Sequence, residues 1–184
     1  MSNIKLENLP YYTYADYEIW EGEWELINGI PYATAPSLRV NHQAISSLIV
    51  FSLTESIKDC EQCLVLMEQD WKLNESTILR PDVMLVCNEP GDAFVTKHPE
   101  IIFEVLSKNS IKKDQNIKFE IYQEEKVPYY IIVSPDDLKA SLYRLENNKY
   151  SKLGDFTHEQ FAFDGLTCNA RIDFQEVFRR FRDK

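Results

Sequence analysis

The stretch Ile-Ile-Phe-Glu-Val-Leu, residues 101–106, holds a single acid inside a run of apolar side chains. Short apolar runs bounded by polar residues are typical of strands that are covered on both faces of a sheet. An ionised carboxylate inside such a strand is costly unless a charged partner compensates it. The run therefore predicts a buried strand, in which Glu104 is either a structural salt-bridge residue or a metal-binding or catalytic carboxylate.

The segments around this run predict more strands and a helical crossover. Residues 112–125 have an apolar face and charged residues elsewhere, which predicts a helix after the strand that ends at Ser107. Apolar or alternating runs predict strands at 63–70, 81–87, 100–107, 129–134 and 140–146, with one more after Asn147-Asn148. Helices that flank a run of strands indicate an α/β fold, here a mixed central β-sheet flanked by α-helices.

The two ends of the chain carry turn and capping signals. Residues 13–21 begin with a Thr cap and predict a short helix, and Asn28-Gly29 between two apolar runs predicts a β-hairpin over residues 24–32. A longer helix is expected to begin at Ser37, with Leu38, Ile45, Leu48, Ile49 and Phe51 at helical spacing. The last helix, 173–181, begins at Asp173 and has Glu176 at the capping-box position.

Composition limits the class of protein. The chain has 184 residues, 44% of them hydrophobic and 27% charged, so we expect one packed core and a single domain over residues 1–184. No apolar run approaches the roughly 20 residues of a transmembrane helix, so no membrane partner is expected. The N-terminus lacks an apolar signal segment, which predicts a cytoplasmic protein whose four cysteines are reduced.

Net charge gives weak support for a nucleic-acid partner. The formal charge is −10, with a balance of −11 over residues 1–104 and +1 over residues 105–184. Basic residues of the second part form two clusters: Lys108, Lys112, Lys113 and Lys118, then Arg179, Arg180, Arg182 and Lys184. A solvated face is the ordinary interpretation of such clusters, although DNA binding is not excluded.

Two further residues could act together with Glu104. Asp82 directly precedes the apolar run 83–86, and on a strand next to Glu104 it would complete a two-carboxylate site for Mg²⁺. Leu106 lies on the same strand face as Glu104 but cannot supply a charge. The following helix could deliver an ammonium instead, from Lys118, which stands four residues after Asp114 on a shared helix face. Taken separately, Asp82 is also an ordinary acid at a strand entrance and Lys118 a solvated surface lysine.

The order of these fragments resembles a known family. The fragments are Arg80-Pro81-Asp82-Val83, Phe103-Glu104-Val105-Leu106-Ser107, Asp114-x₃-Lys118-x₃-Tyr122 and Val127-Pro128-x-Tyr130-x-Ile132-Val133-x-Pro135, preceded by Trp24-Glu25-Leu26-Ile27-Asn28-Gly29 and His42. Together they resemble the Uma-two family of restriction endonucleases, within the PD-(D/E)XK nuclease superfamily, over roughly residues 20–180.

The resemblance implies a restriction-endonuclease-like sheet and a site for a divalent cation. Asp82 and Glu104 would be the metal-binding carboxylates, Glu25 a further acid near the metal, and Lys118 the displaced lysine. Leu106 occupies the position at which the superfamily usually has its lysine. The cofactor expected from this resemblance is Mg²⁺ or Mn²⁺.

Other groups of residues rank lower as sites. Cys60-Glu-Gln-Cys63 has the spacing of a zinc knuckle or redox pair, but zinc needs a second ligand pair, and Cys87 and Cys168 are isolated in the sequence. His42 is either a helix histidine or, by family analogy, a neighbour of the acidic site. An aromatic stripe of Tyr11, Tyr12, Tyr14, Tyr17, Trp20 and Trp24 favours core or dimer packing over base stacking.

Two functions remain open from the sequence. The first is a Mg²⁺-dependent endodeoxyribonuclease that hydrolyses DNA phosphodiester bonds and acts as a homodimer. The second is a catalytically inactive nuclease-fold module that serves as a binding or dimerisation scaffold, since a fold does not by itself define a function. The pair Asp82 and Glu104 favours the enzyme, and the overall acidity favours the scaffold.

Overall fold

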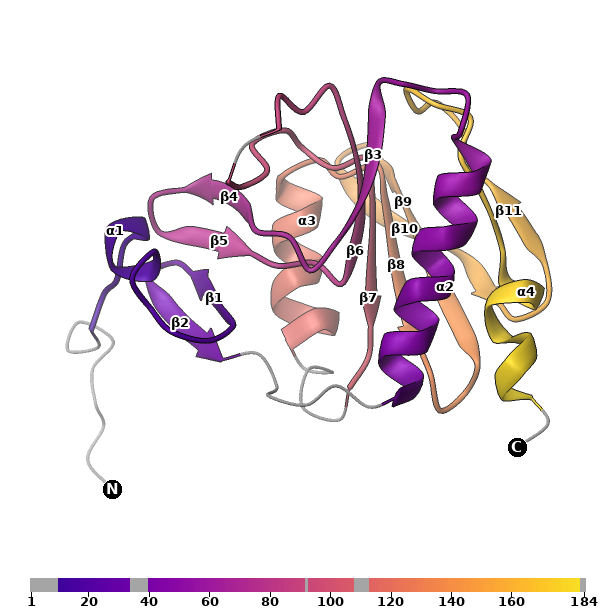
Figure 1. Cartoon of the computed structure of the whole chain (residues 1–184), viewed down its shortest axis with the longest axis horizontal. Helices are drawn as coiled ribbons and strands as arrows, with labels where there is room; N and C mark the ends of the chain where they lie inside the picture. Colours follow the sequence, from indigo (N-terminus) through magenta and orange to yellow (C-terminus); the bar gives the residue numbers. More distant parts are fainter. Residues whose placement is uncertain (1–9, 34–39, 92, 108–112, 183–184) are drawn as a thin grey trace.

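The computed structural model describes residues 10–33, 40–91, 93–107 and 113–182, and they form three layers (Figure 1). A six-stranded sheet lies in the middle. Helix α2 (Val40–Ser56) and helix α4 (Phe174–Phe178) cover one face of this central sheet. Helix α3 (Phe119–Glu124) and a four-stranded sheet cover the other.

The central sheet is mixed, as the sequence predicts. Its strand order is β10-β9-β8-β7-β6-β3, from β3 (Cys63–Met67), β6 (Val83–Cys87), β7 (Ile101–Val105), β8 (Tyr129–Ser134), β9 (Lys139–Glu146) and β10 (Lys149–Phe156). Strands β7 and β8 pair in parallel, while the other described neighbours in this sheet are antiparallel. A parallel pair needs a crossover, which is supplied here by the π-helix η2 (Lys113–Lys118) and α3.

Side-chain alternation along β7 divides the core into two clusters. Phe103 belongs to the cluster on the side of α2, together with Ile45 and Leu53 of that helix. Ile102 belongs to the opposite cluster, with Tyr122 of α3 and Trp71 of the smaller sheet. Because residues two apart share a face of a strand, Glu104 lies on the side of Ile102, under α3.

The smaller sheet consists of strands that the sequence predicts only in part. Its order is β2-β1-β5-β4, from β1 (Trp24–Ile27), β2 (Ile30–Ala33), β4 (Trp71–Asn74) and β5 (Thr77–Leu79). The hairpin of β1 and β2 is confirmed, with Asn28 and Gly29 at φ 50° and 75° as a two-residue turn requires. Strands β4 and β5 were not predicted, because each is too short to show a clear alternation.

The predicted helices are present, with shorter bounds. Helix α1 (Tyr14–Tyr17) begins after Thr13, whose N–H donates to Asp16 at 2.8 Å. Helix α4 begins after Asp173, which accepts from the N–H of Glu176, and the short helix η3 (Arg179–Phe181) follows. The predicted cap Ser37 and Leu38 lie outside the described residues. No helix of the described chain has the length and apolar character needed to cross a membrane.

The cysteines differ from the expectation of four reduced thiols. Cys60 is bonded to Cys168, and Cys63 to Cys87. The reason is spatial, because β3 and β6 pair with Cys63 directly opposite Cys87. Cys168 lies in the loop between strands β11 (Gln160–Ala162) and β12 (Arg171–Asp173), so the sequence separation of these residues hid their proximity.

Candidate active site

The carboxylate of Glu104 is buried but well compensated. Its exposed fraction is 2%, and its position on β7 places it between the central sheet and α3. Its Oε1 atom accepts hydrogen bonds from Lys118 Nζ and from the Tyr122 hydroxyl, each at 2.7 Å. One positive charge and one hydroxyl thus replace part of the water that this acid loses on folding.

Lys118 joins two buried acids from different sheets. Its Nζ atom lies 2.7 Å from Glu25 Oε1 and 2.7 Å from Glu104 Oε1, and all three side chains are almost fully buried. Lys118 ends the π-helix η2 (Lys113–Lys118), which belongs to the crossover from β7 to β8, so this crossover carries the ammonium back over β7. The interpretation of Lys118 as a solvated surface lysine is wrong, since its exposed fraction is 2%.

Glu25 reaches the site because the smaller sheet packs on the central one. Strand β1 pairs with β5 through Leu26 opposite Ile78, which brings Glu25 next to the end of β5. The backbone N–H of Arg80, just after β5, donates to Glu25 Oε1 at 2.9 Å. Glu25 is fully buried, and its carboxylate is therefore held from both sides by a charge and a backbone dipole.

Asp82 lies at the edge of this cluster and is more open to solvent. Val83 is opposite Phe103 in the antiparallel pair β6–β7, so the same register continued by one residue sets Asp82 opposite Glu104. The Oδ2 atom of Asp82 accepts from the N–H of Val105 at 2.6 Å. Its side chain is 17% exposed, so Asp82 is more open to solvent than Glu104, which is 2% exposed.

His42, on helix α2, also contacts the carboxylate of Asp82. Its Nε2 atom lies 3.3 Å from Asp82 Oδ2, while its buried Nδ1 atom has no hydrogen-bond partner among the described residues. Burial lowers the pKa of His42, but the hydrogen bond and charge of Asp82 and the charge of Glu68 outweigh it and raise this pKa. The analogy that placed His42 near the acidic site agrees with this geometry.

With this geometry established, comparison with known proteins decides the family. The model of the Uma2 (Uma-two) family, described as "Putative restriction endonuclease", matches residues 14–168. The chain belongs to the Uma2 family. The resemblance inferred from the sequence fragments is thereby confirmed, and the matched segment includes the whole Glu25, Glu104, Lys118 and Asp82 cluster.

A solved structure supports the fold of this Uma2 chain. It is described as a "putative nuclease belonging to DUF820 from Anabaena variabilis ATCC 29413". The TM-score is 0.74 at 14% sequence identity, and the match covers 91% of this chain and 97% of that chain. The α/β fold class is therefore confirmed. Among curated proteins, none matches this chain.

The donor atoms of the Uma2 site suit a hard divalent cation. Glu104 on β7 and Asp82, directly before β6, offer carboxylate oxygens, and Mg²⁺ prefers oxygen ligands. Within the described residues, the clusters of three or more potential ligands within 4.8 Å of one another are cysteine clusters, and none contains these acids. Asp82 and Glu104 would thus form a two-carboxylate site, which fits an ion that keeps several of its waters.

Asp70, Arg80 and Tyr17 form a second polar cluster next to the site. Asp70 lies 3.8 Å from the guanidinium of Arg80 and accepts from the Tyr17 hydroxyl at 2.9 Å. Burial raises the pKa of Asp70, and the hydrogen bond from Tyr17 and the charge of Arg80 oppose that shift. The Trp20 ring contacts the rings of Tyr17 and Trp24, as expected for packing side chains.

Two features of the site were not predicted from the sequence. The hydrogen bond of Tyr122 to Glu104 was not predicted, although the spacing of four between Lys118 and Tyr122 could have indicated that both side chains reach Glu104. The basic cluster that includes Lys118 is not an exposed run, because Lys118 is buried. Lys108 and Lys112 lie outside the described residues, as does the Asp114 side chain.

Proposed function

We propose that this chain is a metal-dependent endodeoxyribonuclease that hydrolyses DNA phosphodiester bonds with Mg²⁺ or Mn²⁺. The observation that carries the proposal is the buried ammonium of Lys118, 2.7 Å from both Glu25 and Glu104, beside the partly exposed Asp82. Clusters of buried ionisable side chains are typical of active sites. Membership of a family described as restriction endonucleases supports the same conclusion.

Each residue has a distinct task in this proposal. Asp82 and Glu104 hold the cation, which when bound supplies Lewis-acid chemistry and a more acidic water. Lys118 orients the attacking water or stabilises the charge that develops on the phosphoryl oxygens. Glu25 and Tyr122 act on DNA only indirectly, because they fix Lys118 and Glu104 in position.

The charges of the cluster support the proposal that Glu104 binds a cation despite its burial. Lys118 offsets one of the two buried carboxylates, so Glu25 and Glu104 together with Lys118 retain a single negative charge. Asp82 adds another negative charge at the solvent-facing edge. A divalent cation would neutralise this remainder, which is the charge balance that a resident Mg²⁺ requires.

A direct assay separates the enzyme from the scaffold. The purified chain is incubated with supercoiled, linear duplex and single-stranded DNA, with and without Mg²⁺ or Mn²⁺. We expect cleavage of at least one DNA substrate that requires the cation and is abolished by a chelator. Absence of cleavage of all substrates with both cations would instead support the inactive binding or dimerisation scaffold, which the net charge of −10 favours.

We also propose that the protein acts as a homodimer in the cytoplasm. Large apolar side chains remain exposed on this chain, namely Tyr11 at 66%, Ile19 at 78%, Val40 at 81% and Phe51 at 65%. A second copy that covers such side chains would place two sites on one duplex. Light scattering at micromolar concentration is expected to give the mass of a dimer, and a monomer mass throughout would contradict it.

A further inference from the structure

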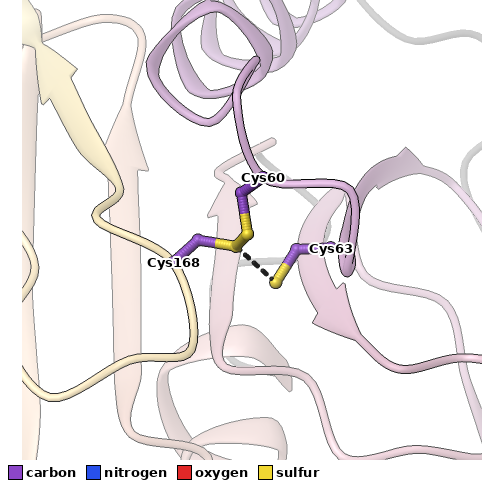
Figure 2. A group of neighbouring side chains, drawn as sticks. All are labelled: Cys60, Cys63 and Cys168. Atoms are coloured by element: carbon purple, nitrogen blue, oxygen red, sulfur yellow. Dashed lines mark hydrogen bonds between the residues drawn. A yellow bond between two sulfur atoms is a disulfide. The ribbon is translucent and has the colours of Figure 1, made fainter.

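Three cysteines from distant parts of the chain bring their sulfur atoms together at the edge of the central sheet. Cys60 follows α2, Cys63 begins the edge strand β3, and Cys168 lies in the loop before β12 (Figure 2). Their Sγ atoms all lie within 4.8 Å of one another. The two disulfides are in contact, since Cys168 Sγ is 2.8 Å from Cys63 Sγ, which belongs to the other bridge.

Cys87 completes the group as a fourth sulfur. It ends β6 and lies opposite Cys63, to which it is bonded. Cys63, Cys87 and Cys168 are buried, at 6%, 7% and 4% exposed, and Cys60 is partly exposed. Two independent disulfides do not require their sulfurs to lie close together, whereas a site that uses all four sulfurs does.

We propose that these four cysteines, when reduced, form a tetrathiolate site for Zn²⁺. Zinc is bound tetrahedrally by thiolates at about 2.3 Å, which separates neighbouring sulfurs by about 3.8 Å. That separation is compatible with the sulfurs of Cys60, Cys63 and Cys168, which lie within 4.8 Å of one another, and Cys87 Sγ lies within 4.8 Å of Cys63 Sγ. Cys60 and Cys63 have the two-residue spacing of a zinc knuckle, and the structure supplies Cys87 and Cys168 as the second pair that the sequence hid.

The chemistry of the two forms balances as follows. Each disulfide takes two electrons and two protons from a dithiol reductant, which itself becomes a disulfide, so the two bridges give four thiols. Zn²⁺ then binds the four sulfurs as thiolates, and the thiol protons pass to water. The disulfide form and the zinc form are therefore alternatives that share the same ligands.

The site would act as a clamp and not as part of the proposed active site. It joins the end of α2, the corner of β3 and β6, and the loop before β12, so it fastens the C-terminal segment to the sheet. Cys87 ends β6, whereas Asp82 precedes the first residue of that strand. A strand of five residues spans about 17 Å, so the zinc site and the carboxylates are separate.

Glu100 provides a matched control for the ligand assignment. Its carboxylate oxygen lies within 4.8 Å of the sulfurs of Cys63 and Cys87. It also accepts a hydrogen bond from the N–H of Thr167 at 2.9 Å, which gives it a structural role of its own. If the four sulfurs are the ligands, Glu100→Gln retains zinc while each cysteine variant loses it.

The test measures metal content and the spectrum of a cobalt substitute. The full chain is purified with a phosphine reductant, desalted in the presence of a weak chelator and analysed for zinc, iron and acid-labile sulfide. We expect one zinc ion per wild-type chain. Cys87→Ser, Cys168→Ser and Cys60→Ser should each release zinc at a chelator concentration at least about tenfold lower, and Glu100→Gln should behave as the wild type. Co²⁺ bound to the reduced wild type should give the intense visible and thiolate charge-transfer bands of a tetrahedral site.

Several outcomes would overturn the proposal. These are folded, reduced wild type without zinc, equal zinc retention in the serine variants, zinc loss in Glu100→Gln as large as in Cys168→Ser, or iron with acid-labile sulfide in place of zinc. If a serine variant does not fold, the wild-type cobalt spectrum decides, because an octahedral spectrum excludes the four-thiolate site. DNA cleavage is not a readout here, so neither result bears on the nuclease proposal.

Discussion

Lys118 Nζ lies 2.7 Å from Glu104 Oε1, and both side chains are removed from solvent. The two residues are 14 apart in the chain, and the crossover from β7 to β8 turns back so that its π-helix ends over the strand it has just left. Glu25 completes the arrangement from the second sheet. The same contacts thus hold the two sheets together and position the proposed catalytic charges.

Removal of the Lys118 charge should destabilise the protein strongly. Lys118→Met leaves Glu25 and Glu104 buried without their shared cation, and breaking a buried ion pair costs about 3–5 kcal/mol. Urea unfolding of the wild type and the variant measures the loss. The matched control is Lys152→Met, whose partner Asp155 is 2.7 Å away on the surface and whose pair contributes at most about 1 kcal/mol. A loss for Lys118→Met no larger than for Lys152→Met would contradict the buried pairing.

The hydrogen bond from the Tyr122 hydroxyl to Glu104 should contribute measurably to the free energy of unfolding. Tyr122→Phe removes one hydrogen bond to a charged, buried acceptor, so we expect a loss of about 1.5–3 kcal/mol in the free energy of unfolding. Tyr143→Phe, which removes a hydroxyl outside the site, is the control. The same urea titration serves for both, and equal losses for the two variants would show that the bond to Glu104 adds nothing.

Asp82 and Glu104 should together make the melting temperature depend on a divalent cation. Cation binding to the folded state raises the melting temperature by linkage, so Mg²⁺ or Mn²⁺ should stabilise the wild type. Asp82→Asn/Glu104→Gln should lose this increment, while Asp155→Asn, at an exposed ion pair, should keep it. An equal metal-induced shift in the wild type and the double variant would exclude these acids as the ligands.

Asp70 should make stability depend on pH in a defined direction. Because the pKa of Asp70 is raised from its ordinary value of 3.8, the folded state binds this proton more tightly than the unfolded state. Its contribution is present below pH 3.8 and is lost as the pH rises through the folded pKa. Asp70→Asn, which does not titrate, should therefore gain stability relative to the wild type between pH 3 and pH 7. A difference that stays constant or falls over this range would refute the assignment.

Local sequence patterns predicted most of the central sheet. The run 101–106 is β7, the Asn28-Gly29 turn forms the hairpin, and Asp173 caps the last helix. These features depend on a few neighbouring residues, so the sequence alone carries the information. Strands β4 and β5 escaped prediction because their burial comes from packing on the central sheet, which no local pattern reports.

The residues of the candidate site could be predicted from the sequence, but the contacts between them could not. Glu104 is conspicuous as an acid in an apolar run, Lys118 was inferred from the helix that follows this run, and Glu25 came from the family resemblance. The burial of Lys118 between two sheets is a tertiary property, as is the meeting of Cys87 with Cys63 across β3 and β6. Residues that are isolated in the sequence became neighbours through strand pairing, and this is why the cysteine cluster was underrated.

Single-turnover cleavage by Asp82→Asn tests whether Asp82 and Glu104 support metal-dependent DNA cleavage. Asp82 is partly exposed, so this variant should fold, and Asp70→Asn serves as a control acid. At saturating DNA and Mg²⁺ we predict cleavage by the wild type and Asp70→Asn, and a rate at least ~10²-fold lower for Asp82→Asn. Equal rates for Asp82→Asn and the wild type, or a wild type that cleaves no DNA with any divalent cation, would contradict the account.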